Sequence, residues 1–192
     1  MKRNATVALA KWLSAGGSRI GQLFIQRHGH VFSLRHVDDA GRDNLRVCSR
    51  PEDARALANY NEAGEFRPLK TTRDLARGWR LELDDIDALR VALDYLYPAM
   101  VGIWASWERE ELESVSWRGT LNRQTGMYRV TQRITDEQSR AMIDSFCARC
   151  LKCRLWDGQH PSPGKDEMPL LCHEACNLLV AEARKIVKSE SA

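Results

Sequence analysis

The stretch that decides how this chain is organised is Cys147-Ala148-Arg149-Cys150-Leu151-Lys152-Cys153, followed after a polar loop by Cys172-His173-Glu174-Ala175-Cys176. Five of the six cysteines lie here, and the sixth, Cys48, stands alone. Chance rarely produces three thiols at successive i+3 spacings and then a second pair nearby. Four thiolates can close around one metal centre, so the pattern indicates an iron–sulphur or zinc site, and we favour a [4Fe–4S] cluster.

The spacing of the cysteines bears on which metal is bound and which thiols bind it. C-x-x-C places two sulphurs on one tight turn, and Cys172 and Cys176 share one helix face if the closing helix starts there. A ferredoxin run is only partly matched, because its final Cys-Pro is missing. Zinc is the alternative, since four-cysteine ribbons also use C-x-x-C pairs. Five thiols for four places leave one spare: Cys147 and Cys150 pair naturally, and Cys153 can replace either or lie beside the cluster.

Composition and charge exclude several classes of protein. The 192 residues are 43% hydrophobic and 29% charged, with a net charge of +3 and no basic stripe, which argues against a nucleic-acid partner. No apolar run approaches the roughly 18 residues that a membrane span needs. The first residues do not form a convincing signal peptide, because Lys11 interrupts the apolar run. Clustered C-x-x-C cysteines without an export signal favour a reduced, cytoplasmic location.

The hydrophobic pattern predicts an α+β fold with an antiparallel meander near the N-terminus. The meander is expected to follow a first helix over Thr6 to Ser14, and its strands are predicted at Arg19 to Arg27, His30 to Val37 and Leu45 to Cys48. His28-Gly29-His30 is expected to form the hairpin turn. His28, His30 and His36 are interpreted as surface residues, and Cys48 as a buried apolar one.

Helices are expected to cover this sheet and to build the C-terminal part. Their predicted limits are Ser49–Arg50 to Tyr60, Asp84–Asp85 to Tyr97, Met100 to Trp107, Thr135 to Phe146, and a closing helix after Cys176. Asp84–Asp85 and the Thr135/Gln138 pair have the chemistry of helix N-terminal caps, and Pro98 is expected to interrupt the helical pattern. Trp79 to Leu83 alternates as a further strand, and Gly64 to Leu69 is expected to be irregular or a short strand. A polar stretch from Glu108 to Gly119 divides residues 1–115, an α+β domain, from residues 116–192, a mainly helical iron–sulphur domain.

Several segments outside the cysteine stretch resemble a bacterial chelatase-associated family. The matching segments are Phe66-Arg67-Pro68-Leu69-Lys70, Gly78-Trp79-Arg80-Leu81-Glu82-Leu83, Tyr97-Pro98-Ala99, Arg123-Gln124-Thr125-Gly126-Met127-Tyr128-Arg129 and the terminal cysteines. Members of that family have a stabilising domain followed by a 4Fe–4S cluster-binding domain. In larger relatives these domains follow a CbiX-type sirohydrochlorin cobaltochelatase module. The resemblance covers nearly the whole chain and implies a connection to cobalamin or related tetrapyrrole synthesis.

The resemblance, together with the pairing of the thiols, implies Cys147, Cys150, Cys172 and Cys176 as cluster ligands, with Cys153 as the alternative ligand. Chelatase catalysis is not implied, because this sequence has no chelatase module and shows no paired histidines of the kind such enzymes use. No Ser/His/Asp arrangement, P-loop or dinucleotide fingerprint supports a catalytic centre either.

Three functions follow as hypotheses. The first is a [4Fe–4S] electron-transfer protein or accessory partner of a cobalt chelatase, working with a sirohydrochlorin cobaltochelatase or another redox partner. The second is a zinc-stabilised interaction module without redox activity. The third is an enzyme that handles a tetrapyrrole, with Arg123, Tyr128 and Arg129 gripping its carboxylates.

Overall fold

A computed structural model of the chain describes residues 2–39, 41–57, 78–113, 115–150, 152–156, 162–172 and 175–190, except for the side chains of residues 2–4 and 148–150. The chain divides into two compact units, Met1–Leu112 with Ser162–Leu170 and Glu113–Pro161 with Leu171–Ala192. The α+β fold class is confirmed: the first unit contains a mixed sheet with helices, and the second is mainly helical. No helix in the described ranges is both long and apolar enough to cross a membrane.

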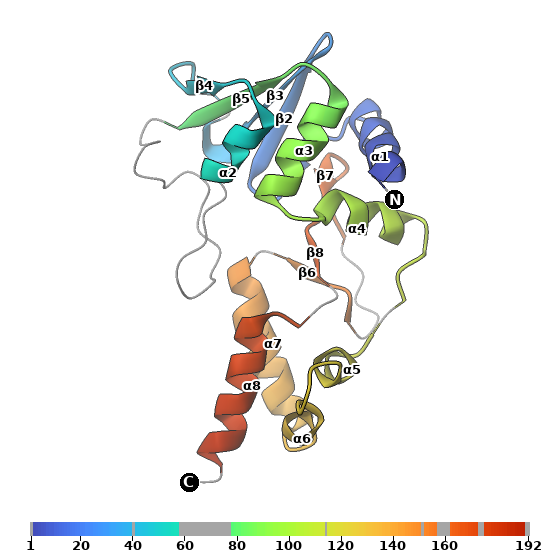
Figure 1. Cartoon of the computed structure of the whole chain (residues 1–192), viewed down its shortest axis with the longest axis vertical. Helices are drawn as coiled ribbons and strands as arrows, with labels where there is room; N and C mark the ends of the chain where they lie inside the picture. Colours follow the sequence, from blue (N-terminus) through green and yellow to red (C-terminus); the bar gives the residue numbers. More distant parts are fainter. Residues whose placement is uncertain are drawn as a thin grey trace. The chain divides into compact units, whose positions relative to one another are not determined.

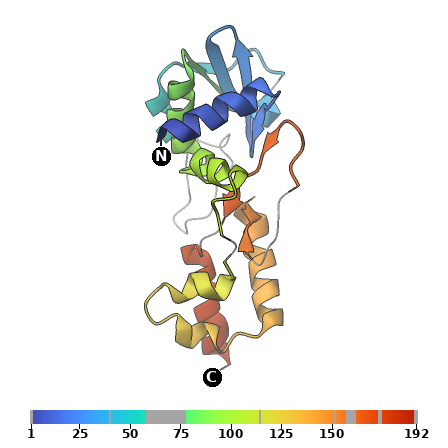
Figure 2. The same ribbon diagram turned by 90° about the vertical axis from the view of Figure 1, so that its right-hand side faces the viewer.

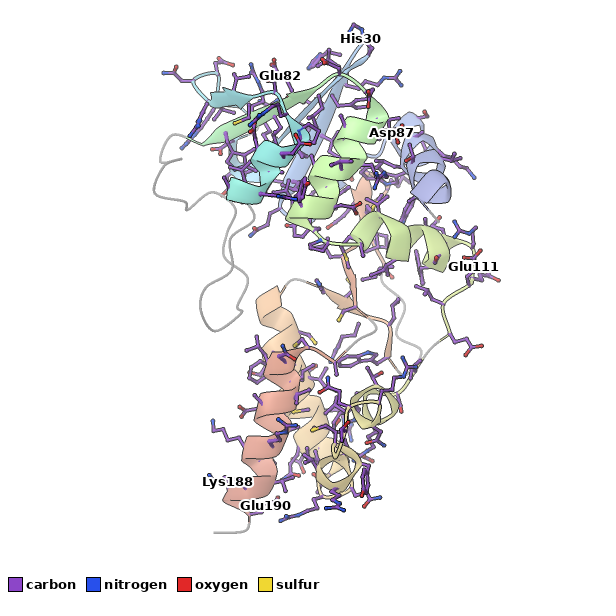
Figure 3. The ribbon with its side chains drawn as sticks, viewed as in Figure 1. His30, Glu82, Asp87, Glu111, Lys188 and Glu190 are labelled. Atoms are coloured by element: carbon purple, nitrogen blue, oxygen red, sulfur yellow. The ribbon has the colours of Figure 1, made fainter. Side chains whose placement is uncertain are left out.

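The first unit is built on a mixed sheet, which in the described residues has the strand order β4-β5-β3-β2-β1-β7. The strands are β1 (Arg19–Ile20), β2 (Leu23–His28), β3 (Val31–His36), β4 (Arg46–Cys48), β5 (Trp79–Leu83) and β7 (Glu167–Met168). The predicted first strand is divided in two, because Gly21, at a φ of 54°, reverses the chain between β1 and β2. The hairpin between β2 and β3 turns at Gly29 and His30, as predicted, and His30 lies at its tip (Figure 3).

The predicted place of the strand at Leu45 to Cys48 is wrong. It was expected as the third strand of the meander, but β4 pairs in parallel with β5, and β5 lies between β4 and β3. The short helix η1 (Val37–Asp39) follows β3 and starts the connection that carries the chain past the position later taken by β5. A hydrophobic pattern identifies a strand but does not say which neighbour it pairs with.

Helices pack on the sheet of the first unit and on one another (Figure 1). They are α1 (Lys2–Ser14), η2 (Pro51–Asp53), α2 (Ala54–Leu57), α3 (Ile86–Leu96) and α4 (Met100–Glu108). The predicted cap of α3 is confirmed, since the Asp85 carboxylate accepts a hydrogen bond of 2.8 Å from the amide of Ala88. Leu89 and Leu93 then face the core. The predicted part of the second helix beyond Leu57, and the segment Gly64 to Leu69, lie outside the described residues.

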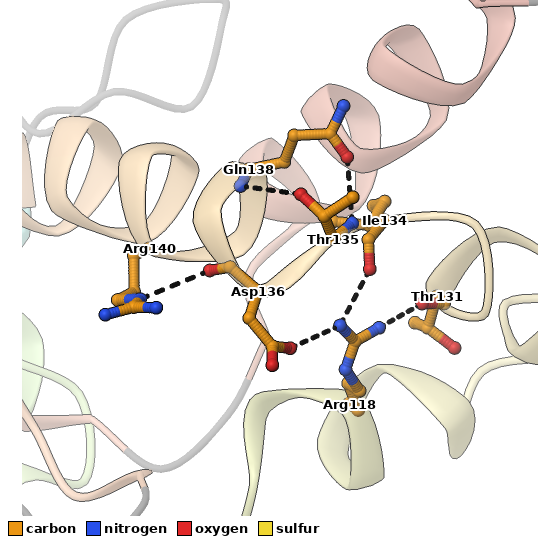
Figure 4. Close-up of polar contacts among 7 residues, drawn as sticks. All are labelled: Arg118, Thr131, Ile134, Thr135, Asp136, Gln138 and Arg140. Atoms are coloured by element: carbon orange, nitrogen blue, oxygen red, sulfur yellow. Dashed lines mark hydrogen bonds and ion pairs between the residues drawn. The ribbon is translucent and has the colours of Figure 1, made fainter.

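The second unit contains the C-terminal helices and a short ribbon (Figures 1 and 2). Its elements are α5 (Trp117–Asn122), α6 (Tyr128–Thr131), α7 (Asp136–Cys150), β6 (Cys153–Arg154), β8 (Leu171–Cys172) and α8 (Asn177–Ser189). The predicted capping box at the start of α7 is confirmed. The Thr135 amide donates to Gln138 Oε1 at 2.8 Å, and the Gln138 amide donates to Thr135 Oγ1 at 3.2 Å (Figure 4). α7 continues beyond the predicted end near Phe146.

Arg118 links three parts of the second unit. Its guanidinium group donates to the carbonyl oxygens of Thr131 and Ile134, the latter at 2.7 Å, and to the carboxylate of Asp136 at 2.8 Å (Figure 4). These contacts connect α5 to the end of α6 and to the start of α7. Side chains from α5, α7 and α8 then form one apolar core, which includes Trp117, Ile143 and Val180.

Candidate metal centre

The two long helices of the second unit run antiparallel. Gln138, at the start of α7, donates a hydrogen bond of 2.6 Å to the carboxylate of Glu190, just beyond the end of α8. Figure 3 shows Glu190 and Lys188 at this end of α8. At 1.5 Å per residue, the helices are about 22 Å and about 20 Å long. The last turn of α7, with Cys147 and Cys150, therefore lies at the same end of the pair as Cys176, which precedes the first turn of α8.

Cys147 is anchored by packing. Its side chain is buried, with 9% of its surface exposed, and it belongs to the same apolar core as Trp156, Leu179 and Val180. Cys150 is the last residue of α7, and its side chain lies outside the described part of the structure. The first pair of cysteines is thus carried by a helix whose position is set by its packing against α8.

Cys153 and Cys172 lie on the ribbon of β6 and β8. The two strands pair in parallel, with Cys153 opposite Leu171 and Arg154 opposite Cys172, and the amide of Leu155 donates to the Cys172 carbonyl at 2.9 Å. Paired residues of a ribbon share a face and successive residues alternate, so Cys153 and Cys172 lie on opposite faces. Sequence spacing gave no indication of this difference.

Cys176 has extended backbone and caps α8, and its side chain is exposed. The expectation that Cys172 and Cys176 share one helix face is not met, because Cys172 lies in β8 and the helix begins only at Asn177. Cys176 is nevertheless placed beside the first amides of α8. These amides carry the positive end of the helix dipole, which favours an anionic group at this position.

The donor chemistry fits an iron–sulphur cluster, which cysteine thiolates hold. Cys147, Cys150, Cys153, Cys172 and Cys176 all belong to the second unit. Among the described side chains, which leave out those of Cys150, His173 and Glu174, no three Cys, His, Asp or Glu residues form a group that could hold a metal ion. The full ligand set therefore stays a prediction.

The other predicted residues lie apart from the cysteines in the sequence and show ordinary surroundings. Tyr128 and Arg129 are exposed and contact each other: Arg129 Nε donates to the phenol oxygen at 2.9 Å, and the guanidinium carbon lies 5.5 Å from the ring centroid. Arg123 is exposed at the end of α5. Their role in binding an anion stays a prediction.

The structure gives the burial of two residues of the first unit, His36 and Cys48, whose positions the sequence predicted. His36 is buried, with 4% exposed, because it continues the inward alternation of Phe32 and Leu34 along β3; the predicted surface position is wrong for this histidine. Cys48 is half-buried on β4. Burial, helped by the negative charge of Asp53, raises the pKa of the Cys48 thiol.

Two family models match the sequence. Residues 109–185 match a 4Fe–4S iron–sulphur cluster binding domain, and residues 5–110 match the DR2241 stabilising domain. The first of these matches, on the part of the chain that carries the clustered thiols, identifies an iron–sulphur protein whose cofactor is a [4Fe–4S] cluster. The second spans more than half of the chain, so the chain belongs to the DR2241 stabilising domain family.

A solved structure resembles this chain over nearly its whole length. It is DR2241 from Deinococcus radiodurans, at 35% sequence identity and a TM-score of 0.73, and the match covers 95% of this chain and 42% of that one. DR2241 is described as a multi-domain protein with structural similarity to chelatases but also with two additional novel domains. This chain thus spans less than half the length of that protein. No curated protein matches the sequence.

Proposed function

We propose that Cys147, Cys150, Cys172 and Cys176 hold the [4Fe–4S] cluster, and that the protein serves as a one-electron carrier or accessory partner of a chelatase. The observation that carries this proposal is the antiparallel pairing of α7 and α8, which brings the C-terminal end of α7 level with the capping residue of α8. Cys147 and Cys150 thereby lie at the same end of the helix pair as Cys176, although at least 25 residues separate them from it in the sequence.

The register of the ribbon supports Cys153 as the spare thiol. Cys172 shares its face with Arg154, whereas Cys153 shares the other face with Leu171. A cluster that binds Cys172 on one face would have to reach around the ribbon to bind Cys153 as well. The ligand set implied by the family resemblance therefore agrees with the local geometry of β6 and β8.

Charges around the cysteines suit an anionic cluster. When bound, the cluster supplies one-electron redox chemistry, at a potential set by burial, nearby charge and hydrogen bonds to sulphur. The first amides of α8 offer positive partial charge beside Cys176. Arg154 adds a positive charge on the face of Cys172, although its guanidinium group also pairs with Asp144 at 2.6 Å. Cys147 differs from Cys172 and Cys176, because its surroundings are buried and apolar rather than positively charged.

The chelatase part of the proposal is supported by the similarity to DR2241, which has structural similarity to chelatases. We infer that this chain acts with a separate sirohydrochlorin cobaltochelatase in cobalamin or tetrapyrrole synthesis, in a cytoplasmic setting. In the first unit, His28 and His30 are exposed around the hairpin turn and His36 is buried, so these three do not form a paired-histidine metal site in the described residues.

Anaerobic purification followed by iron, acid-labile sulphide and zinc analysis tests the ligand set. We expect four irons and four sulphides per chain, lost on Cys147→Ser, Cys150→Ser, Cys172→Ser or Cys176→Ser. Cys153→Ser and Cys48→Ser are the matched controls and should retain both. Stoichiometric zinc without sulphide would support the zinc-stabilised module instead. Iron loss on Cys153→Ser with retention on Cys172→Ser would overturn the proposed ligand set.

The partnership is tested separately. The reduced protein is mixed with a sirohydrochlorin cobaltochelatase, and cobalt insertion is followed with and without the chain under anaerobic conditions. We expect a higher insertion rate with the cluster-loaded chain than with its Cys172→Ser variant. Equal rates, together with no complex in calorimetric titration, would contradict the partnership and leave the cluster assignment intact.

A further inference from the structure

The second unit contains a cavity of about 360 Å³ that none of the predicted site residues lines. Its walls carry three arginines, Arg118, Arg140 and Arg154, and two tryptophans, Trp117 and Trp156. This volume is in the range of small-molecule sites, which are typically about 300–1,000 Å³. Arginine planes and indole rings on the same cavity are suited to a flat ligand that carries negative charge.

The lining residues leave an excess of positive charge. Asp136 is the acidic residue among those that line the cavity, and its carboxylate offsets one of the three positive charges. Arg118 donates a hydrogen bond to this carboxylate and so lowers the pKa of Asp136, with Arg118 and Arg140 charges acting in the same direction (Figure 4). Asp136 therefore stays ionised near neutral pH. Asp144, which does not line the cavity, pairs with Arg154 at 2.6 Å. Three positive charges and two negative charges still leave a net positive charge at the wall.

The three arginines differ in how they are held. Arg118 is fixed by the backbone carbonyls of Thr131 and Ile134 as well as by Asp136. Arg140 donates from Nε to the Asp136 carbonyl at 3.4 Å, and Arg154 pairs with Asp144. A guanidinium group has five N–H donors, more than these contacts of Arg140 and Arg154 use. Both can therefore donate to an anion in the cavity.

Trp156 forms a buried, flat wall of the cavity. Its side chain is only 2% exposed, and its indole Nε1 is buried without a hydrogen-bond acceptor among the described residues. Buried polar groups normally have a partner, and an indole N–H can only donate. Because this nitrogen is buried, a bound molecule could accept from it only if the indole ring turned, so the ring serves the cavity as a flat apolar wall. Trp117, 5% exposed, forms a second flat wall, with the Arg118 guanidinium carbon 4.9 Å from its ring centroid.

We propose that this cavity binds a small aromatic carboxylate: a planar ring system with carboxylate groups that accept hydrogen bonds from Arg140 and Arg154, beside the indole rings of Trp117 and Trp156. This binding does not depend on the proposed electron-transfer function. The cavity does share Arg154 with the face of Cys172 and Trp156 with the core around Cys147. A bound ligand would therefore alter the charge and burial beside two proposed cluster ligands.

Calorimetric titration of the anaerobically purified full chain with naphthalene-2,6-dicarboxylate tests the proposal. We expect binding that weakens as salt is raised. Arg140→Gln and Arg154→Gln should each weaken it about tenfold, the effect of one charge-assisted hydrogen bond. Trp156→Phe keeps an aromatic wall, and Trp156→Ala removes it, so the alanine variant should weaken binding more than the phenylalanine variant. Arg184→Gln changes an exposed arginine of α8 that does not line the cavity, and should leave affinity unchanged.

Two further probes define the ligand class. Neutral naphthalene-2,6-dimethanol and inorganic phosphate should each bind at least tenfold more weakly than the dicarboxylate, because each lacks one of the two recognised features. Equal binding of phosphate would overturn the aromatic carboxylate in favour of a simple anion site. Loss of binding on Arg129→Gln but not on Arg140→Gln would overturn the cavity in favour of the exposed Tyr128–Arg129 pair.

Iron and sulphide are measured on every variant, so that a failure of the cavity proposal can be distinguished from a failure of the cluster proposal. Full iron content with no binding of the dicarboxylate overturns the cavity proposal alone. Binding with the expected variant pattern in a chain that lacks iron supports the cavity and counts against the cluster assignment. A change in the reduction potential of the cluster on adding the dicarboxylate, absent in Arg154→Gln, would support the link between the two sites.

Discussion

The two units of this protein differ in the interactions that stabilise each of them. The first has strands of up to six residues, a sheet covered by helices, and fully buried side chains such as Trp79, Leu81 and Leu93. The second has strands of two residues, short helices α5 and α6, and a smaller core that includes Cys147. Burial of large apolar side chains accounts for the first unit. The second unit has the smaller core and carries the thiols, so we expect metal binding to contribute to its stability.

Removal of the cluster iron should produce the largest difference in stability between the two units. We expect amide protection in α7 and α8 to fall by on the order of 100-fold or more, while β2, β3 and β5 keep theirs, because metal binding is coupled to folding only where the ligands lie. Hydrogen exchange measured by mass spectrometry, before and after anaerobic chelation, follows both units in one sample. Equal loss of protection in both units would contradict the division, and Cys48→Ser serves as the control with cluster retained.

Truncating a core side chain should produce the converse effect. Leu93 is 1% exposed on α3, so Leu93→Ala should destabilise the first unit by about 2–5 kcal/mol through lost burial and the cavity left behind. Native-state hydrogen exchange of β3 and β5 gives this free energy, and iron content should stay unchanged. Val7→Ala, at a side chain that is 67% exposed, should change stability by about 0.5 kcal/mol or less. Iron loss in Leu93→Ala would show that the units are not independent.

What the sequence predicted well in both units is local. The Asp85 cap, the Thr135/Gln138 box and the break at Pro98 each depend on residues within four positions of one another, and the structure contains all three features. Alternating burial along Trp79–Leu83 was equally readable.

What the sequence did not predict depends on distant residues. β7 comes from the loop between the two cysteine groups, yet it pairs in parallel with β1 of the first unit. No local pattern indicates such a partner for two residues. The cavity was missed for the same reason, since its arginines come from α5, α7 and β6 and none of them belongs to a motif. In contrast, the cysteine spacing pointed to the cluster because all five thiols fall within one short stretch.

The hydrogen bonds of Arg118 should contribute measurably to the stability of the second unit, which has the smaller apolar core. Arg118→Met keeps the stem of the side chain but removes its hydrogen bonds to Thr131, Ile134 and Asp136. We expect the opening free energy of α5 to α7 to fall by about 1.5–3 kcal/mol, the usual range for hydrogen bonds to a charged group. Hydrogen exchange of the cluster-loaded protein measures this. Arg123→Met, at an exposed arginine at the opposite end of α5, is the control, and an equal effect there would contradict the special role of Arg118.

The smallest expected effect is pH-dependent and lies in the first unit. A hydrogen bond from the Arg50 side chain, followed by those from the backbone amides of Arg50 and Ser49, outweighs burial and lowers the pKa of Asp53. A carboxyl whose pKa is lower in the folded than in the unfolded state stabilises the fold above its unfolded pKa, and this contribution is lost as the pH falls through the folded pKa. Asp53→Asn should therefore cost less than about 1 kcal/mol at pH 7, since the pair is close to solvent.

The cost of Asp53→Asn should shrink toward zero as the pH falls below the range in which carboxyls ionise, because the parent then loses the same charge by protonation. Exchange of amides in α2 and β4 is compared between parent and variant at each pH, so that acid effects common to both cancel. The iron-stripped chain is used, because acid destroys the cluster. Asp43→Asn, at an exposed aspartate, is the matched control. A cost that grows as the pH falls would contradict the lowered pKa and remove Asp53 from the groups that stabilise the first unit.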